Sequence, residues 1–180
     1  MNELNEPENS AERMLWTAGP PPTAPTWTGL HDQVMGGRSQ GGAQLQAGDG
    51  IEPDHVLFSG QISTDNGGGF ASYRMRLPAP IAIGLARAVV LTWRGDGGPF
   101  KLCLHRQNDW DGVQWQADLS TPGHWITREL PLSAFVARRR GRELRERPLS
   151  PDDALFQLGL MTTRPDPGPF WLALARIALS

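Results

Sequence analysis

Apolar and polar residues alternate along many short segments of this chain. In residues 70–77, FASYRMRL, the alternation places Tyr73 and Met75 on one face of an extended segment. In residues 100–106, FKLCLHR, Cys103 and His105 lie opposite the apolar face. Residues 88–94 are instead nearly all apolar and predict a central strand buried on both faces. Further strand-like segments, separated by Gly, Pro, Asn and Asp, are residues 43–47, 55–63, 113–119, 125–130, 155–163 and 170–179. Strands at a spacing of roughly 8–12 residues predict an all-β sandwich or barrel.

Two parts of the chain depart from this pattern. Residues 1–26 are polar at first and then rich in proline, which predicts a flexible N-terminal arm preceding a domain of residues 27–180. Residues 131–150 have little alternation, so we expect an excursion between strands with a helical turn near Ser133. The following segment, SPDDAL, has Ser150 in an N-cap position and predicts one helical turn.

Composition narrows the class of protein. A chain of 180 residues with a formal charge of −2 fits one domain with no general attraction to nucleic acid or to an anionic membrane. No apolar run is long enough to span a bilayer, and the acidic N-terminus resembles neither a secretory signal nor a transit peptide. We therefore expect a cytoplasmic protein. Cys103 is the single cysteine, which excludes an internal disulfide and predicts a buried, inert thiol.

Three glycine-rich stretches are candidates for ligand contact or for turns. HDQVMGGRS contains Asp32 and Arg38, but Ala43 replaces the lysine that a phosphate-binding loop requires. DNGGGF, which begins at residue 65, has a strong turn signal at Asn66. RGDGGPF contains Asp96 and predicts a hairpin between its flanking strands. In each stretch a structural corner and a contact surface both remain open, because glycine permits either.

Several other patterns suggest specific chemistry less strongly. Residues 107–118 approach the spacing of a calcium loop, but their flanks are strands, and a hairpin with Trp110 at its tip explains them better. The four histidines have no metal-ligand spacing, and no nucleophile motif occurs, so we expect no metal, no cofactor and no catalytic residue. Residues 137–147 carry six arginines and predict either a solvated loop or a docking surface for an acidic partner.

The order of the motifs resembles that of a known family. These motifs are WTGLHDQVMGGRS, FSGQISTDNGGGFASYR, LTWRGDGGPFKLCL, GHWITRELPLSAFVARRRGR, LFQLGLM and GPFWLALARIAL. Together they are similar to the family of complex I intermediate-associated protein 30 (CIA30), over residues 27–179. The resemblance implies a jelly-roll sandwich of the galactose-binding-domain-like type. It also implies an assembly chaperone for NADH:ubiquinone oxidoreductase or, in photosynthetic organisms, for photosystems.

The sequence also lacks two features that some relatives have. No G-x-G-x-x-G motif joins a strand to a helix, so the dinucleotide-binding fusion found in part of the family is not expected. The absence of a transit peptide suggests a bacterial member of the family. A non-catalytic module that binds a protein client is therefore the main hypothesis. A carbohydrate-binding module is the alternative, on fold analogy alone.

Loss of partner binding, without loss of folding, would distinguish contact residues from structural ones. Most of the candidates belong to the motifs of the family, and Trp110 is added as an exposed aromatic side chain. The partner- or ligand-binding candidates are Asp32, Arg38, Asn66, Arg74, Arg94, Asp96 and Trp110.

Overall fold

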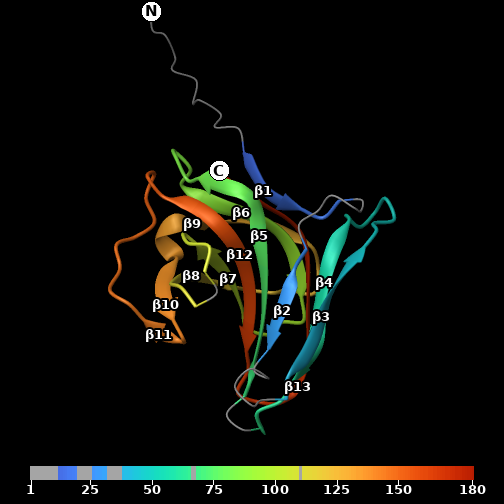
Figure 1. Cartoon of the computed structure of the whole chain (residues 1–180). Coiled ribbons are helices and arrows are strands. Elements are labelled where there is room, and N and C mark those ends of the chain that lie inside the picture. The colour runs from blue at the N-terminus through green and yellow to red at the C-terminus, as the bar shows by residue number, and fades with distance from the viewer. Residues whose placement is uncertain (1–11, 20–25, 32–37, 66–67, 110) are drawn as a thin grey trace, which may run out of the picture.

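The computed structural model describes residues 12–19, 26–31, 38–65, 68–109 and 111–180. These residues form a six-stranded and a seven-stranded sheet, in which the paired strands run antiparallel (Figure 1). The all-β architecture expected from the alternating pattern is confirmed.

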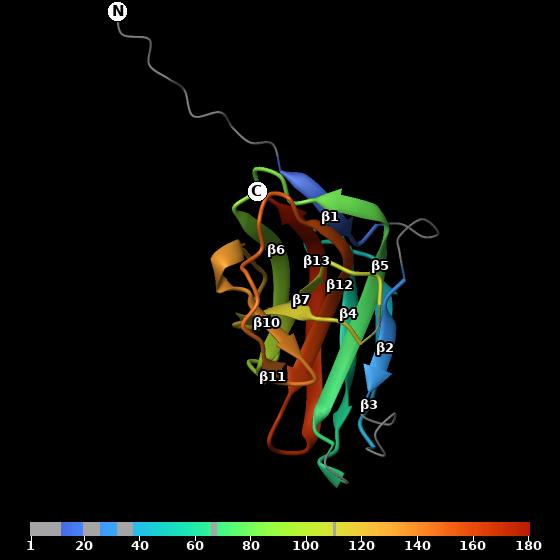
Figure 2. The same ribbon diagram turned by 60° about the vertical axis from the view of Figure 1, so that its left-hand side comes forward.

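The first sheet, sheet A, has the strand order β3-β4-β13-β6-β9, and β1 pairs with β13. Figures 1 and 2 show β1 and the C-terminus at the same end of the sandwich. The strands of sheet A are β1 (Arg13–Thr17), β3 (Gln40–Gln46), β4 (His55–Ile62), β6 (Ala88–Gly95), β9 (Ile126–Pro131) and β13 (Gly168–Leu179).

The second sheet, sheet B, has the strand order β11-β10-β8-β7-β12-β5-β2. A short 3-10 helix, η3 (Leu132–Ala134), connects β9 of sheet A to β10 of sheet B. The strands of sheet B are β2 (Thr28–His31), β5 (Phe70–Ala82), β7 (Phe100–His105), β8 (Gln114–Leu119), β10 (Val136–Arg139), β11 (Arg142–Glu143) and β12 (Ala154–Thr163).

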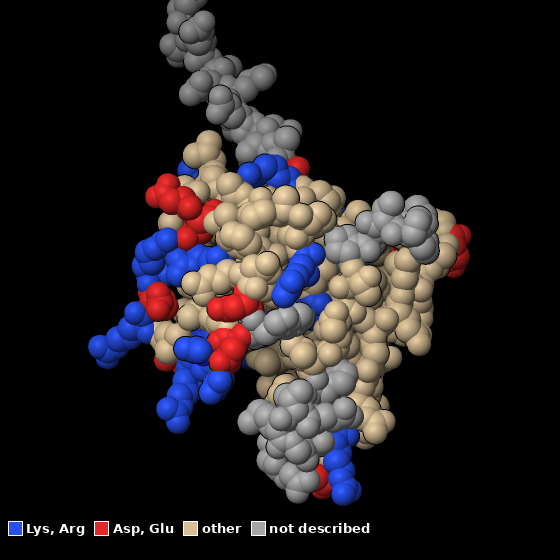
Figure 3. All heavy atoms as spheres, in the orientation of Figure 1, with Lys and Arg blue, Asp and Glu red and all other residues tan. Residues whose placement is uncertain are grey.

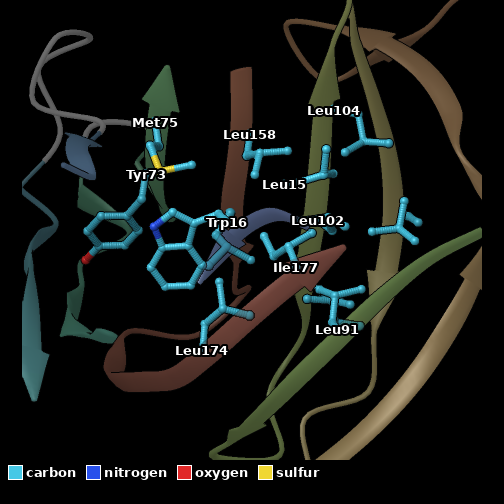
Figure 4. Packing of buried hydrophobic residues seen from close by; sticks show 14 of the residues in the cluster. Leu15, Trp16, Tyr73, Met75, Leu91, Leu102, Leu104, Leu158, Leu174 and Ile177 are labelled. Carbon is cyan, nitrogen blue, oxygen red and sulfur yellow. The ribbon is translucent and has the colours of Figure 1, made fainter. Parts of the chain in front are cut away.

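The hydrophobic core lies between the two sheets, because the inward face of each strand is apolar. Figure 4 shows side chains from both sheets pointing into this space, among them Tyr73, Leu102 and Leu174. Every second residue of a strand faces inward, so the alternation in the sequence becomes the core of the sandwich. Further members of the core in the same view are Leu15, Trp16, Met75, Leu91, Leu104, Leu158 and Ile177.

Part of the expected N-terminal arm belongs to sheet A. Residues 13–17 form β1, which pairs antiparallel with β13. Leu15 and Trp16 are buried, and the Trp16 ring lies edge-on to Trp27, with 5.6 Å between ring centroids. The apolar triplet that begins at Met14 thus anchors this stretch. The triple proline of the arm lies outside the described residues.

Strand β5 extends beyond the segment predicted from alternation, which ended at Leu77. Its pairing with β12 runs as far as Arg76 and resumes at Ile81, so the prolines at 78 and 80 lie where the ladder is interrupted. Proline has no N–H to donate to a neighbouring strand, which explains why the break falls there.

The segment between β9 and β12 differs from the prediction in two respects. The arginine-rich stretch contains the short hairpin of β10 and β11, in addition to the expected turn of helix at η3. The predicted helix at Ser150 is wrong. A turn occupies these residues because the Asp153 carboxylate accepts hydrogen bonds from the Ser150 backbone N–H (2.8 Å) and from two guanidinium groups, and β12 begins directly afterwards at Ala154.

Candidate functional site

The three glycine-rich stretches are corners where the chain passes from one sheet to the other. They join β2 to β3, β4 to β5 and β6 to β7, and the members of each pair lie in different sheets. The hairpin predicted at Asp96 is therefore wrong, because β6 belongs to sheet A and β7 to sheet B. To pass from one sheet to the other the chain has to span about 10 Å, which needs a wider turn than a hairpin. Several glycines favour such a turn, because glycine adopts backbone conformations that other residues avoid.

The strand ends that these stretches connect lie at one end of the sandwich, together with the β12–β13 connection (Figure 1). Gly168 pairs with Ile62, and Thr163 pairs with Phe70, which brings the ends of β4 and β12 beside the starts of β13 and β5. We call these four loops the glycine-loop end. Two candidate residues in it, Asp32 and Asn66, lie outside the described residues.

Asp96 ties three of the four loops together. Its carboxylate accepts hydrogen bonds from Nη2 of Arg164, at 2.8 and 2.7 Å, and from the backbone N–H groups of Gly98 and Trp171, both at 2.8 Å. The Arg164 backbone N–H in turn donates to the Gly69 carbonyl at 3.0 Å. Ion-paired hydrogen bonds are stronger than neutral ones. Asp96 therefore holds the loops in place and does not present a free carboxylate.

The glycines after Asp96 are required by this arrangement. Gly97 has a φ of +84°, a conformation that side chains with a Cβ rarely adopt. A Cβ on Gly98 would lie 2.3 Å from Nη2 of Arg164, so any side chain there would displace the guanidinium. The two glycines after Asp96 thus provide the turn and the space that the ion pair between Asp96 and Arg164 needs.

Arg38 and Ser39 show the two roles that a corner loop can have. Ser39 is fully buried, and its Oγ donates to the Ser63 carbonyl at 3.2 Å and accepts from the Ser63 N–H at 3.0 Å. The side chain of Arg38 is 74% exposed, and its Nη1 lies 3.9 Å from Oδ2 of Asp65. A pair so exposed contributes little to stability, so Arg38 is available to a partner.

Arg94 does not join Asp96 at the glycine-loop end. Its guanidinium donates to both carboxylate oxygens of Glu52, at 2.6 and 2.8 Å, and its Cζ lies 4.9 Å from the Trp125 ring centroid and 6.0 Å from that of Trp171. A bidentate partner and two nearby rings fix the orientation of this arginine. The geometry favours a structural role for Arg94 on the outer face of sheet A.

Among the described candidate residues, Arg74 differs most from the exposed position that the sequence predicted for it. The alternation in β5 places it on the outer face of sheet B, yet it is only 6% exposed. Burial lowers the pKa of its guanidinium, an effect that the negative charges of Asp109 and Asp111 oppose. Asp109 and Asp111 belong to the β7–β8 connection, and Trp110 between them lies outside the described residues.

Arg74 belongs to a group of buried polar side chains that we call the polar cluster. Its members come from four neighbouring strands of sheet B and are Arg74, Cys103, His105, Gln116 and Gln157. Burial raises the pKa of the Cys103 thiol to about 12, which keeps it neutral, as its strand-like surroundings predicted. Burial, with a smaller effect of Arg74, lowers the pKa of His105 to about 3. Sequence reasoning placed His105 on this face but did not recognise it as a candidate.

Most arginines of the 137–147 segment have acidic partners within the chain. Arg139 and Arg140 both bind the Asp111 carboxylate, with distances of 3.2 and 2.6 Å, and Arg138 pairs with Glu143 across the β10–β11 hairpin. Figure 3 shows side chains of both charges gathered over these strands, whereas the surface over β12 and β5 is mostly uncharged. The segment is thus not an open cationic patch.

Two kinds of feature are absent from the described part of the chain. No group of three or more His, Cys, Asp or Glu side chains there is arranged to hold a metal ion. No helix among the described residues has the length and apolar character needed to cross a bilayer.

The described residues thus form an antiparallel sandwich of two sheets, without a helical layer. Residues 16–174 match the model of the family described as Complex I intermediate-associated protein 30 (CIA30). The chain belongs to this family, and the resemblance seen in its motifs is confirmed. No curated protein sequence matches it.

Solved structures support the same fold. The Family 11 carbohydrate-binding module of a cellulosomal cellulase of Clostridium thermocellum has a TM-score of 0.67 and 16% identity, covering 93% of each chain. The same module in complex with a β-1,3-1,4-mixed-linked tetrasaccharide gives 0.67 and 18%, covering 93% of this chain and 94% of that chain. A mutant of the family 29 module CBM29-2 gives 0.53 and 9%, covering 95% and 92%. At these identities the likeness establishes the antiparallel two-sheet β-sandwich and nothing further.

Proposed function

We propose that this chain is a non-catalytic binding protein that assists the assembly of a membrane electron-transfer complex of the complex I type in a bacterial cytoplasm. The observation that carries the proposal is the family match, which spans residues 16–174 and so includes every strand of both sheets in full except β1 and β13, which it includes in part. Its client would be a protein subunit of such a complex.

The glycine-loop end is the surface that we assign to the client. Asp96 and Arg164 fix its loops to one another, so binding would not require those loops to become ordered. Arg38 and Asp65 are exposed and can form charge contacts with a partner. The buried acids do not suggest catalysis, because Asp96 and Asp153 are both held by arginines.

Affinity capture from the native host tests this proposal. The tagged chain should retain subunits of a respiratory or photosynthetic complex, identified by mass spectrometry. Arg38→Glu should reduce that capture several-fold without changing the melting temperature, because its ion pair with Asp65 is exposed. Arg128→Glu, at an exposed position on β9, is the matched control. Capture without any such subunit would refute the assembly role, and equal losses in both variants would refute the assigned surface.

A further inference from the structure

The polar cluster occupies the outer face of sheet B, where its members form two adjacent rows. Arg74 lies opposite Gly159, which lies opposite Cys103, and Cys103 lies opposite Gln116. In the next row, Gln157 lies opposite His105. The register therefore brings side chains from β5, β12, β7 and β8 onto one small area of the face that points away from the hydrophobic core.

Three polar atoms of this cluster are buried and have no hydrogen-bond partner among the described residues. Gln157 is fully buried, and its Nε2 donates to the carbonyls of Gln107 (3.2 Å) and Asp109 (3.1 Å), which fixes the amide group. Its Oε1 has no partner, and neither ring nitrogen of His105, which is 1% exposed, has one either. A buried polar atom that lacks a hydrogen bond destabilises a fold. Three such atoms on neighbouring residues of an outer face point to a ligand.

Gly159 lies at the centre of this arrangement. A Cβ built there would lie 3.1 Å from the Cβ of Cys103 and 3.5 Å from Nε2 of His105. The imidazole thus reaches over the glycine, into the row between Arg74 and Cys103. No side chain of residue 159 separates His105 from that row, so one ligand group can meet both rows at this point.

The charges around the cluster exclude an ionic ligand. A cation would be repelled by the buried guanidinium of Arg74. An anion would face Oε1 of Gln157, which can only accept hydrogen bonds, and the nearby carboxylates of Asp109 and Asp111. The neutral imidazole of His105 offers one donor and one acceptor. A hydroxyl group, which both donates and accepts, satisfies these atoms together.

The rest of the molecule favours a saccharide over a protein as the source of the hydroxyl. Protein interfaces depend on apolar and aromatic anchors. Among the described residues, the large hydrophobic side chains that are exposed are Met14, Leu45, Ile51 and Leu85, and none of them belongs to a strand of sheet B. We propose that the polar cluster is a binding site for the hydroxyl groups of a neutral saccharide. This inference goes beyond the assembly role and does not depend on it.

An array of neutral oligosaccharides, followed by calorimetry with a glycan that binds, tests this site. His105→Phe should weaken binding by roughly tenfold or more, because the imidazole hydrogen bonds are lost. The same substitution should leave the melting temperature equal or higher, because it removes two buried atoms that lack partners. Thr127→Val, on the outer face of sheet A, should bind like the parent chain. If the phenyl ring is too large for the site, His105→Leu replaces His105→Phe as the test variant, with the same expected results.

Several results would overturn the proposal. One is the absence of binding to every neutral saccharide at millimolar concentration. Another is binding that His105→Phe and His105→Leu leave unchanged, and a third is binding of acidic glycans alone. Because client capture and glycan binding are measured separately, with variants at opposite places in the fold, failure of one leaves the other intact.

Discussion

His105 shows how a single strand position acquires unusual properties from its neighbours. Alternation in β7 places it on the outer face of sheet B, but the β7–β8 connection and the adjacent strands bury it. Burial, with a smaller effect of Arg74, holds its pKa near 3 in the folded state, whereas an unfolded chain would have the ordinary value near 6.5. The residue type predicted none of this, because Arg74 and Gln157 of the neighbouring polar cluster come from β5 and β12, far from His105 in the sequence.

The stability of the protein should therefore fall on acidification. Between pH 6.5 and 3 the unfolded state binds a proton at His105 that the folded state does not, so the free energy of unfolding decreases as the pH falls. The loss at this residue is at most about 1.4 kcal/mol per pH unit. Urea unfolding at pH 6.5, 5.5 and 4.5 should show a steeper decrease for the parent chain than for His105→Phe. Parallel decreases would contradict the assignment.

Asp153 contributes in a lower pH range, which keeps the two effects separate. Burial alone would raise the pKa of its carboxyl, but hydrogen bonds from Arg147 and from the Ser150 N–H, together with Arg106, lower it to about 2. Its stabilisation is present above the unfolded value of 3.8 and is lost as the pH falls toward 2. The comparison above pH 4.5 therefore reports mainly on His105.

Asp96 is the residue whose loss should most disturb the glycine-loop end. Asp96→Ala removes four hydrogen bonds and leaves the largely buried guanidinium of Arg164 without its carboxylate. We expect a decrease of about 2–4 kcal/mol in the free energy of unfolding, measured with urea. Asp166→Ala, at an exposed position in the same loop region, should change it by less than about 0.5 kcal/mol. A similar small change for both would show that the ion pair does not hold the loops.

At the scale of elements, β1 illustrates how a strand can be hidden in a polar, proline-rich stretch. It has only five residues, and two of them are buried. Trp16 packs edge-on against Trp27, which in turn packs edge-on against Phe58 of β4, with centroid distances of 5.6 and 5.1 Å. The stretch is too short for its alternation to be distinctive, and its strand state depends on pairing with β13, far away in sequence.

Trp16→Ala should therefore destabilise the whole sandwich and not only its N-terminus. Deleting a buried aromatic side chain from a packed core costs about 3–5 kcal/mol. Met14→Ala on the same strand is the matched control, since Met14 is 48% exposed and its loss should cost less than about 0.5 kcal/mol. Thermal or urea unfolding measures both. If Trp16→Ala left the free energy of unfolding of the whole domain unchanged, β1 would not contribute to the stability of the sandwich.

For the molecule as a whole, the distribution of charge decides which partners are excluded. The net charge is −2, and four of the six arginines between residues 137 and 147 have carboxylate partners in the chain. A basic segment neutralised in this way lacks the uncompensated charge that phosphate-backbone binding requires. The segment is thus a poor candidate for binding nucleic acid.

We accordingly expect no measurable binding to duplex DNA at physiological salt. Fluorescence anisotropy with a labelled duplex is the measurement. Asp111→Asn removes the carboxylate that Arg139 and Arg140 share and should increase binding at low salt. Tight, salt-dependent binding by the parent chain would refute the interpretation of the segment.

The sequence by itself determined the fold class, the positions of most strands and the family. Alternation of side chains has a period of two in any strand, so the core faces of β5, β7 and β8 could be identified residue by residue, as at Tyr73, Leu102 and Trp115. The family followed from several motifs in a fixed order. These features are local, or depend only on the order of motifs along the chain.

Only the tertiary structure decided how distant segments meet. The loop at Asp96 passes from sheet A to sheet B, and Asp96 forms an ion pair with Arg164 there. Arg94 forms an ion pair with Glu52. Arg74 is buried in the same polar cluster as His105 and Gln157. Each outcome depends on which strands pair and on which loop folds over a sheet face. The energies concerned come from contacts between residues far apart in sequence, and a local pattern does not contain them.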